Sequence, residues 1–337
     1  MRLASMARLA SMDMLKGFAI IMVIAGHAVQ YLISGHYYDK EVYRLIYSFH
    51  MPLFMAITGF FASGGGGKYV SVKQLAKRAY HLLLPLVVYA FIMRFIFHAL
   101  PHFTGCLIYN LWFLKSALCC TLLFAITYAV PSRLRWIAII LTLALSQFLL
   151  IFNMKYMYPC FLGGAWLRNN MDWFMSKKKT ITITSGIIWV VMVLFFDEYF
   201  WSYISVEEHN ILPFETLTDS GWWFILIYRT VLGLAGSLMF FGLFEAMATK
   251  GFHHTFIGRI LNKVGQETLW IYVLQTAILE VYLARYLNFD NIHPLAFYML
   301  TVPLISAAVL AVSMLIIQGT RKGLAFSKNY IYKVKSR

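Results

Sequence analysis

Long apolar runs separated by short polar segments cover most of the chain. A helix needs about 20 mostly apolar residues to cross a hydrocarbon core about 30 Å thick. Ten runs approach this length, near 14–34, 45–62, 82–100, 107–130, 136–152, 156–167, 180–196, 222–248, 266–287 and 295–318. The run at 156–167 is short and contains Pro159 and the pair Gly163-Gly164, so we expect it to be broken or re-entrant. The pattern predicts an all-α, polytopic bundle of about ten transmembrane helices.

These runs divide the chain into three parts. We expect a cytoplasmic N-terminal segment at 1–13, a transmembrane domain at 14–318 and a basic cytoplasmic tail at 319–337. The first run, from Met14 to Ile33, is long enough to stay in the membrane, so we expect no removed signal peptide. The two halves show no internal repeat, which disfavours a transporter built from inverted repeats.

The composition also indicates a membrane protein. Of the 337 residues, 61% are hydrophobic and only 13% are charged. A formal net charge of +15 would suit a nucleic-acid binder, but the basic residues lie in short loops between apolar runs. We therefore expect membrane lipids as partners and no nucleic acid. The cysteines lack the spacing of metal ligands, which predicts buried free thiols and no metal site; they are Cys106, Cys119, Cys120 and Cys160.

The positions of the basic residues predict the orientation in the membrane. With a cytoplasmic N-terminus, the external segments hold only Lys40, Arg44, Lys155 and Arg285 of the 29 basic residues. Most of the others then lie in cytoplasmic segments, which is the distribution that the positive-inside rule describes. The distribution predicts that both termini are cytoplasmic.

The first apolar run contains a lysine and a histidine eleven residues apart, Lys16 and His27. At 1.5 Å per residue, His27 lies about 16 Å deeper than Lys16, near the middle of the hydrocarbon core. Ionisable side chains at this depth usually line a cavity or a reaction path. His27 is therefore a candidate catalytic residue, and the structural alternative is a histidine bonded to a neighbouring helix.

The second run and the segment after it carry further polar residues. Pro52 frees the carbonyl group of Ser48 and predicts a kink there. His50, beside it, either bonds this exposed backbone or faces the same cavity as the histidine of the first run. After the glycines at 64–67, the basic segment at 73–81 suits either anionic lipid headgroups or a phosphorylated cytoplasmic ligand.

Charged residues also occur inside the other runs. We expect them to face the bundle interior, where ion pairs among them are a structural explanation; they are Arg94, Lys115, Arg229, Glu245 and Glu280. The external loop at 197–221 is rich in carboxylates and aromatic rings. It is either a solvated loop or a cover over a sugar-binding site.

Several motifs, taken in order, resemble the acyltransferase-3 family of integral-membrane acyltransferases. The first is a basic residue followed after ten residues by a histidine, here Lys16 and His27, with Asp13 just upstream. The others follow in the family's order: Ser48-Phe49-His50-Met51-Pro52-Leu53-Phe54 with Thr58-Gly59, the basic stretch from Arg78 to Pro85, Leu111-Trp112-Phe113-Leu114, Phe161-Leu162-Gly163-Gly164 and the segment from Val264 to Tyr272. Three positions depart from the family pattern: Lys16 replaces an arginine, His81 replaces the second arginine of Arg-x-x-Arg, and Gln275 stands where many members have histidine.

The resemblance implies an acetyl-CoA-dependent O-acetyltransferase of the bacterial inner membrane that modifies surface polysaccharides or lipid-linked glycans. Acetyl-CoA is then a co-substrate, and no bound cofactor is implied. His27 acts as a general base or as a transient acetyl carrier, and its ordinary pKa of about 6.5 suits a base at neutral pH. The implied site residues are His27, Lys16 and Asp13 for catalysis, Lys77, Arg78 and His81 for the nucleotide end of acetyl-CoA, and His50, Trp112 and Lys115 for the substrate.

Two other classes of function stay open at this stage. A proton-coupled transporter or glycan exporter would use His27, Glu245 and Glu280 as a proton relay. A catalytically silent scaffold for glycan assembly would have no need of the pair formed by Lys16 and His27. Acetyl-CoA binding without transport would favour the enzyme, and the sequence leaves open the acceptor sugar, a larger acyl group and a homo-oligomer.

Overall fold

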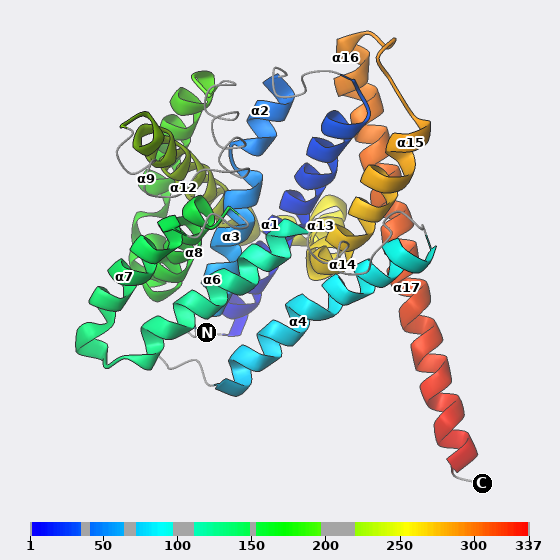
Figure 1. Cartoon of the computed structure of the whole chain (residues 1–337), viewed down its shortest axis with the longest axis horizontal. Coiled ribbons are helices and arrows are strands. Elements are labelled where there is room, and N and C mark those ends of the chain that lie inside the picture. The colour runs from blue at the N-terminus through cyan, green and yellow to red at the C-terminus, as the bar shows by residue number, and fades with distance from the viewer. Residues whose placement is uncertain are drawn as a thin grey trace.

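The computed structural model describes residues 2–34, 41–63, 72–96, 111–148, 153–196 and 220–335. Within these residues the chain is helical and contains no strand (Figure 1). The structure thus confirms the all-α class. The glycines at 64–67, Cys106 and most of the loop at 197–221 lie outside the described residues.

Six described segments are long and apolar enough to cross a membrane, which indicates a multi-pass membrane protein. They are Ala10–Tyr31, Glu41–Ala62, Ala76–Phe95, Trp112–Ala129, Trp223–Thr249 and Pro294–Gly323. Other expected spans correspond to helices that are short for a crossing of about 20 residues, since α7 has 14 residues and α8 has 16. The count of ten and the cytoplasmic location of the termini stay predictions.

The described chain forms helices in the following order. The first part contains α1 (Arg2–Tyr31), α2 (Glu41–Tyr47), α3 (His50–Ala62), α4 (Val72–Phe91), α6 (Trp112–Ala129), α7 (Arg135–Phe148), α8 (Met154–Asn169) and α9 (Met171–Leu194). The second part contains α12 (Ser220–Thr249), α13 (Phe256–Gln266), α14 (Thr268–Gln275), α15 (Ala284–Tyr286), α16 (Pro294–Ala296) and α17 (Val302–Lys335). Short π-helical stretches lie at Ile92–Ile96, Thr276–Leu283 and Phe297–Thr301, and 3₁₀ turns at Ser132–Leu134 and Phe252–His254.

The helix α1 occupies the centre of the assembly. It packs against α3, α12, α13, α14 and α17, so residues on different faces of α1 meet different parts of the chain (Figure 1). Both α1 and α17 extend beyond the apolar runs that predicted them, α1 towards Arg2 and α17 towards Lys335. Hydropathy marks only the stretch that suits hydrocarbon, whereas leucine, alanine, arginine and lysine continue a helix past it.

The kink predicted near Ser48 takes the form of a break between two helices. The second run divides there into α2 and α3, and Ser48 and Phe49 lie between them. Pro52 falls in the first turn of α3, where its missing N–H group would have no intrahelical partner in any case. The proline therefore starts a new helix at His50 instead of bending a continuous one.

The expectation that the run at 156–167 is broken is wrong, because α8 is continuous through Pro159. A proline inside a helix leaves the carbonyl group four residues earlier without its usual donor. Here that carbonyl belongs to Lys155, and Nε2 of Gln147 on α7 donates to it over 3.1 Å. The neighbouring helix thus compensates the lost backbone bond, which sequence alone does not reveal.

Glycines of the sequence motifs allow helices to pack backbone against backbone. A Cβ added at Gly59 of α3 would lie 1.9 Å from the carbonyl oxygen of Phe161, and one at Gly164 of α8 would lie 1.8 Å from that of Ala56. The helices α1 and α13 make the same kind of contact, because a Cβ at Gly265 would lie 1.7 Å from the carbonyl oxygen of Asp13. These glycines fix α3 against α8 and α13 against α1.

We expect Gly164→Ala to destabilise the fold, because the added methyl group forces the backbones of α3 and α8 apart. Overpacking of this kind costs about 1–3 kcal/mol or more. Thermal unfolding in detergent measures the loss. Gly319→Ala on α17 is the matched control, since a Cβ there meets no atom within 4 Å. Equal unfolding temperatures for Gly164→Ala and the parent chain would contradict the role given to this contact.

Candidate active site

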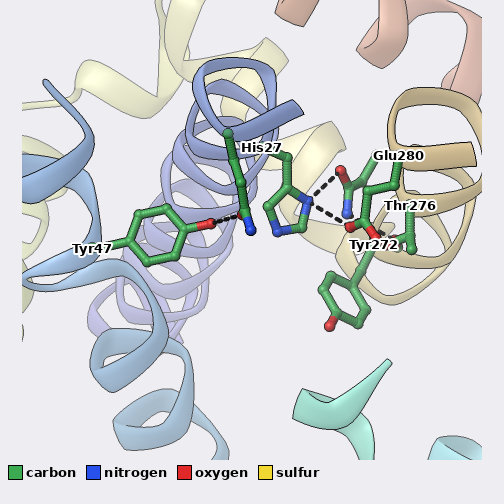
Figure 2. A network of polar contacts seen from close by, with 7 residues as sticks. His27, Tyr47, Tyr272, Thr276 and Glu280 are labelled. Atoms are coloured by element: carbon green, nitrogen blue, oxygen red, sulfur yellow. Dashed lines mark hydrogen bonds and ion pairs between the residues drawn. The ribbon is translucent and has the colours of Figure 1, made fainter. Parts of the chain in front are cut away.

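The imidazole of His27 lies one turn before the C-terminal end of α1 and faces α14 and the π-helical stretch after it. Its Nδ1 atom is 3.0 Å from Oε1 of Gln275 and 3.1 Å from Oε1 of Glu280 (Figure 2). The side chains of His27 and Glu280 are 15% and 19% exposed, so both are largely enclosed and still reachable. His27 thus bonds a neighbouring helix, as its structural interpretation predicted, and its ring is still accessible.

The surroundings of Gln275 determine which ring nitrogen of His27 carries the proton. Nε2 of Gln275 donates to the carbonyl oxygen of Tyr272 over 3.2 Å and to Oγ1 of Thr276 over 2.7 Å. A carbonyl group only accepts, so the amide oxygen of Gln275 must be the atom that faces His27. That oxygen also only accepts, and Nδ1 of His27 therefore donates. Nε2 of His27 keeps a free lone pair, as a base or nucleophile requires.

A π-helical turn brings Gln275 and Glu280 to the same ring. In an α-helix of 3.6 residues per turn, side chains five positions apart point in directions about 140° apart. The stretch Thr276–Leu283 is π-helical instead, and its i→i+5 spacing returns to the same side after five residues. Glu280 consequently joins Gln275 at His27. The sequence does not reveal this π-helical turn, so Gln275 and Glu280 could not be placed together in advance.

A second group of polar side chains lies across α1 from Glu280. The hydroxyl group of Tyr47 donates to Oε1 of Gln30 over 2.7 Å (Figure 2). Tyr31 joins the two groups: its ring meets His27 edge to face at 5.8 Å between centroids, and its side chain hydrogen-bonds Glu280. His50 is buried, and its Nδ1 lies 2.8 Å from the carbonyl oxygen of Ile46. His50 thus bonds the backbone near the break, as one of its two interpretations predicted, but at Ile46 instead of at Ser48.

A cavity of about 290 Å³ lies between α1, α3, α4, α6 and α14, on the Lys16 side of His27. Its polar lining includes Lys16, Arg78 and His81, three residues that sequence analysis placed in the site. On α1 the lining runs from Lys16 to Val23, and His27 is one helical turn further on. The cavity thus leads from a cationic mouth towards the imidazole.

The lysine of the sequence motif is held at this mouth by two contacts. Nζ of Lys16 lies 2.6 Å from Oδ1 of Asp13, one turn earlier on α1, and 5.5 Å from the ring centroid of Phe61. Asp13 also accepts a bond of 3.4 Å from Nε2 of Gln266 at the end of α13. Asp13 therefore positions Lys16 and links α1 to α13.

Arg78 serves the fold as well as the cavity. Its two terminal nitrogens donate to the carbonyl oxygens of Ala62 and Phe61 over 2.7 and 2.8 Å, at the C-terminal end of α3. These bonds satisfy carbonyl groups that a helix end leaves without partners. Arg78 also lines the cavity, whereas the exposed Lys77 does not belong to its lining.

The other predicted substrate residues lie apart from the cavity. Trp112 is half-buried and Lys115 is buried, and neither belongs to the cavity lining. Phe113, between them in the sequence, does line it. Glu245 accepts a bond of 2.6 Å from the hydroxyl group of Ser11, sixteen residues before His27 on α1. The carboxylate of Glu245 is therefore bound at a point on α1 that lies about 24 Å from His27 along the helix axis.

The far end of α1 is fastened by a small polar cluster. Asp290 accepts bonds from the backbone N–H of Ser34 over 2.6 Å and from Nδ2 of Asn288 over 2.9 Å. Hydrogen bonds from Ser34 lower the pKa of this exposed carboxyl group, and the bond from the Ser34 side chain has the largest effect. Because the pKa is lowered, the ionised carboxylate of Asp290 stabilises the fold fully at pH values above the ordinary carboxyl pKa. This stabilisation is lost as the pH falls through the lowered pKa.

Two kinds of sequence comparison find relatives of this chain. A family model described as an acyltransferase domain matches residues 9–318. The nodulation protein NolL of Sinorhizobium fredii (strain NBRC 101917 / NGR234) is 27% identical, over 80% of this chain and 77% of its own length. The nodulation protein NolL of Mesorhizobium japonicum (strain LMG 29417 / CECT 9101 / MAFF 303099) is 25% identical, over 96% and 89%. No solved structure is significantly similar to the chain.

Proposed function

Because the chain belongs to the acyltransferase-3 family, whose model spans residues 9–318, we propose that this membrane acyltransferase moves an acetyl group from cytoplasmic acetyl-CoA to a hydroxyl group of a surface or lipid-linked glycan. The bacterial inner membrane is the proposed location, with the Lys16 end of the cavity open to the cytoplasm. The glycan then approaches His27 from the opposite side.

One observation carries this proposal: the orientation of His27 beyond the end of the cavity. Gln275 and Glu280 hold its Nδ1 atom, so the free Nε2 lone pair belongs to the other edge of the ring. A buried base with one nitrogen fixed by a carboxylate is the arrangement that activates hydroxyl groups in acyl transfer. The cavity extends along α1 to Val23, one helical turn from that base.

The proposed step transfers one proton and one acyl group. The glycan hydroxyl oxygen attacks the thioester carbonyl carbon while its proton passes to Nε2 of His27. The new C–O bond forms, the C–S bond breaks, and the proton then passes from His27 to the departing thiolate of CoA. Glu280 stabilises the imidazolium that exists between these two transfers. A variant of this step, in which Nε2 itself carries the acetyl group, uses the same tautomer.

The residues at the cavity mouth suit a phosphorylated donor. Lys16, Arg78 and His81 bring basic groups to one opening, and the walls behind them are mostly apolar. Cationic side chains bind phosphate through charge-assisted hydrogen bonds, and the planar guanidinium group of Arg78 offers two parallel donors. We propose that the nucleotide end of acetyl-CoA stays at this mouth, with Lys77 on the exposed face beside it, and that the thioester arm enters.

We expect Arg78→Lys to raise the KM for acetyl-CoA about tenfold and to change kcat little, because lysine lacks the planar pair of donors. Steady-state kinetics on vesicles with varied acetyl-CoA measure this split. Arg133→Lys, the same change at an exposed cytoplasmic position outside the cavity, is the matched control. Unchanged KM in Arg78→Lys, with a folded protein, would assign Arg78 to capping α3 alone.

Purified protein in lipid vesicles, given radiolabelled acetyl-CoA and a mixed extract of surface glycans, tests the proposed function. We expect label in the glycan together with release of CoA thiol. Acetyl-CoA supplied on only one side of the vesicle membrane would also identify the donor side, because thiol release and glycan labelling then require the donor on that side. Glycan movement across the vesicle membrane without thioester cleavage would contradict the proposal and favour a transporter.

No observation favours the transporter at present. A proton relay would need His27, Glu280 and Glu245 in contact, yet Glu245 bonds Ser11 near the start of α1. Without Glu245, the pair of His27 and Glu280 fits a base and its partner in acyl transfer.

A further inference from the structure

Mostly aromatic and other apolar side chains line the cavity at its His27 end. This end wall, as we call it, consists of Val23, Met51, Phe54, Phe113 and Tyr272. Phe113 lies at its centre: its ring centroid is 5.8 Å from that of Phe54 and 5.9 Å from that of Tyr272.

Two members of the end wall lie next to the His27 contacts along their helices, and two others pack against each other. On α1, Val23 is followed one turn later by His27, and on α14, Tyr272 is followed by Gln275, which bonds His27. On α3 and α6, Phe54 and Phe113 pack against each other instead. A thioester carbonyl that turns towards His27 therefore directs its acyl chain towards Phe113.

We infer that Phe113, at the centre of the end wall, limits the length of the acyl group and makes the enzyme selective for short acyl thioesters, with acetyl preferred. This inference rests on the proposed function and names its substrate class. Phe113 is half of a rigid ring pair and 9% exposed, so it yields little space to additional methylene groups. Each methylene group that an apolar pocket cannot place changes kcat/KM by about 10- to 200-fold.

The reacting bonds are the same for every chain length. The carbonyl carbon, the thiol and the attacking hydroxyl group meet beside His27, and only the alkyl end of the acyl group reaches Phe113. Selectivity that arises at Phe113 should therefore change with the size of residue 113 while the chemistry at His27 is kept.

The test compares kcat/KM for acetyl-, butyryl- and hexanoyl-CoA in vesicles that contain glycan acceptor. In the parent protein we expect acetyl-CoA to exceed hexanoyl-CoA by at least tenfold. Phe113→Ala should reduce or invert this ratio by at least tenfold, and Phe113→Leu should give an intermediate ratio. Phe124→Ala is the matched control, because Phe124 lies on the same helix and packs against Phe161 and Tyr128 outside the cavity. It should keep the parent ratio.

The outcomes separate this inference from the proposed function. Transfer of no acyl group by the folded parent protein would overturn the function and the inference together. Transfer with the parent ratio in both Phe113→Ala and Phe113→Leu would overturn the inference and leave the function standing. Loss of all transfer in both folded variants would also overturn it, because Phe113 would then be needed for catalysis itself. The conservative Phe113→Leu keeps the test usable where the alanine variant does not fold.

Discussion

His27→Gln should lower kcat for acetyl transfer by about 10²- to 10⁴-fold while the protein stays folded and still binds acetyl-CoA. Glutamine retains N–H groups that can donate to Gln275 and Glu280, so the polar network keeps a donor at this place. It has no nitrogen that accepts a proton at neutral pH, and a positioned general base contributes about this factor. Labelled acetyl transfer in vesicles measures the loss, and donor binding is measured separately.

His50→Gln is the matched control for this change. His50 is also a buried imidazole, but its Nδ1 bonds the backbone of Ile46 instead of Gln275 and Glu280. We expect its loss of activity to follow its loss of folded protein. Equal losses of kcat in the two folded variants would mean that both rings, or neither of them, perform the chemistry.

The same preparations distinguish a base from an acetyl carrier. A carrier forms an acetyl-imidazole on Nε2 when acetyl-CoA is present without acceptor, and mass spectrometry of the peptide that contains His27 would show an added acetyl group. A base forms no such adduct. The free lone pair on Nε2 is compatible with both routes, so the adduct is the observation that separates them.

The sequence was sufficient for the features that follow from hydropathy and spacing. Apolar runs predicted the helical class, and Pro52 predicted a kink near Ser48, where the chain passes from α2 to α3. The eleven-residue spacing of Lys16 and His27 predicted about 16 Å between them along the helix, and α1 is continuous over both residues. These predictions succeed because they depend on the chain's local chemistry and on the regular rise of a helix.

Contacts between distant segments could not be predicted in this way. Nothing in the local sequence around Pro159 shows that Gln147 replaces the lost donor and keeps α8 continuous. Gln275 was noticed only as a departure from the family pattern, and its bond to His27 joins residues 248 positions apart. Arg78 was assigned to the donor alone, although it also caps α3.

The position of Glu280 has a more specific cause. Hydropathy does not distinguish a π-helical turn from an α-helical one, so the contact of Glu280 and Gln275 with the same ring could not be predicted. Such turns occur frequently at functional sites, where the extra residue redirects a side chain. In this chain the redirected side chain is the carboxylate that meets His27, which makes that contact the sharpest test of the site.

Glu280→Gln should lower kcat about 10²-fold with little change in the KM for acetyl-CoA. The amide is nearly isosteric, so packing is kept, but it carries no negative charge to stabilise the imidazolium that forms when Nε2 takes the hydroxyl proton. Its NH₂ group can also donate to Nδ1 of His27, which would place the proton on Nε2 and remove the free lone pair. Both effects act on kcat, because Glu280 does not line the cavity that we propose as the donor site.

Glu267→Gln is the control that matches this change in chemistry and differs in position. Glu267 directly precedes α14 and pairs with Arg321 of α17 over 2.5 and 2.6 Å, so its loss weakens packing without touching His27. We expect Glu267→Gln to lower thermal stability and to keep kcat per folded molecule. If Glu280→Gln instead kept kcat within about twofold of the parent, the carboxylate would be a packing partner, and Gln275 alone would orient His27.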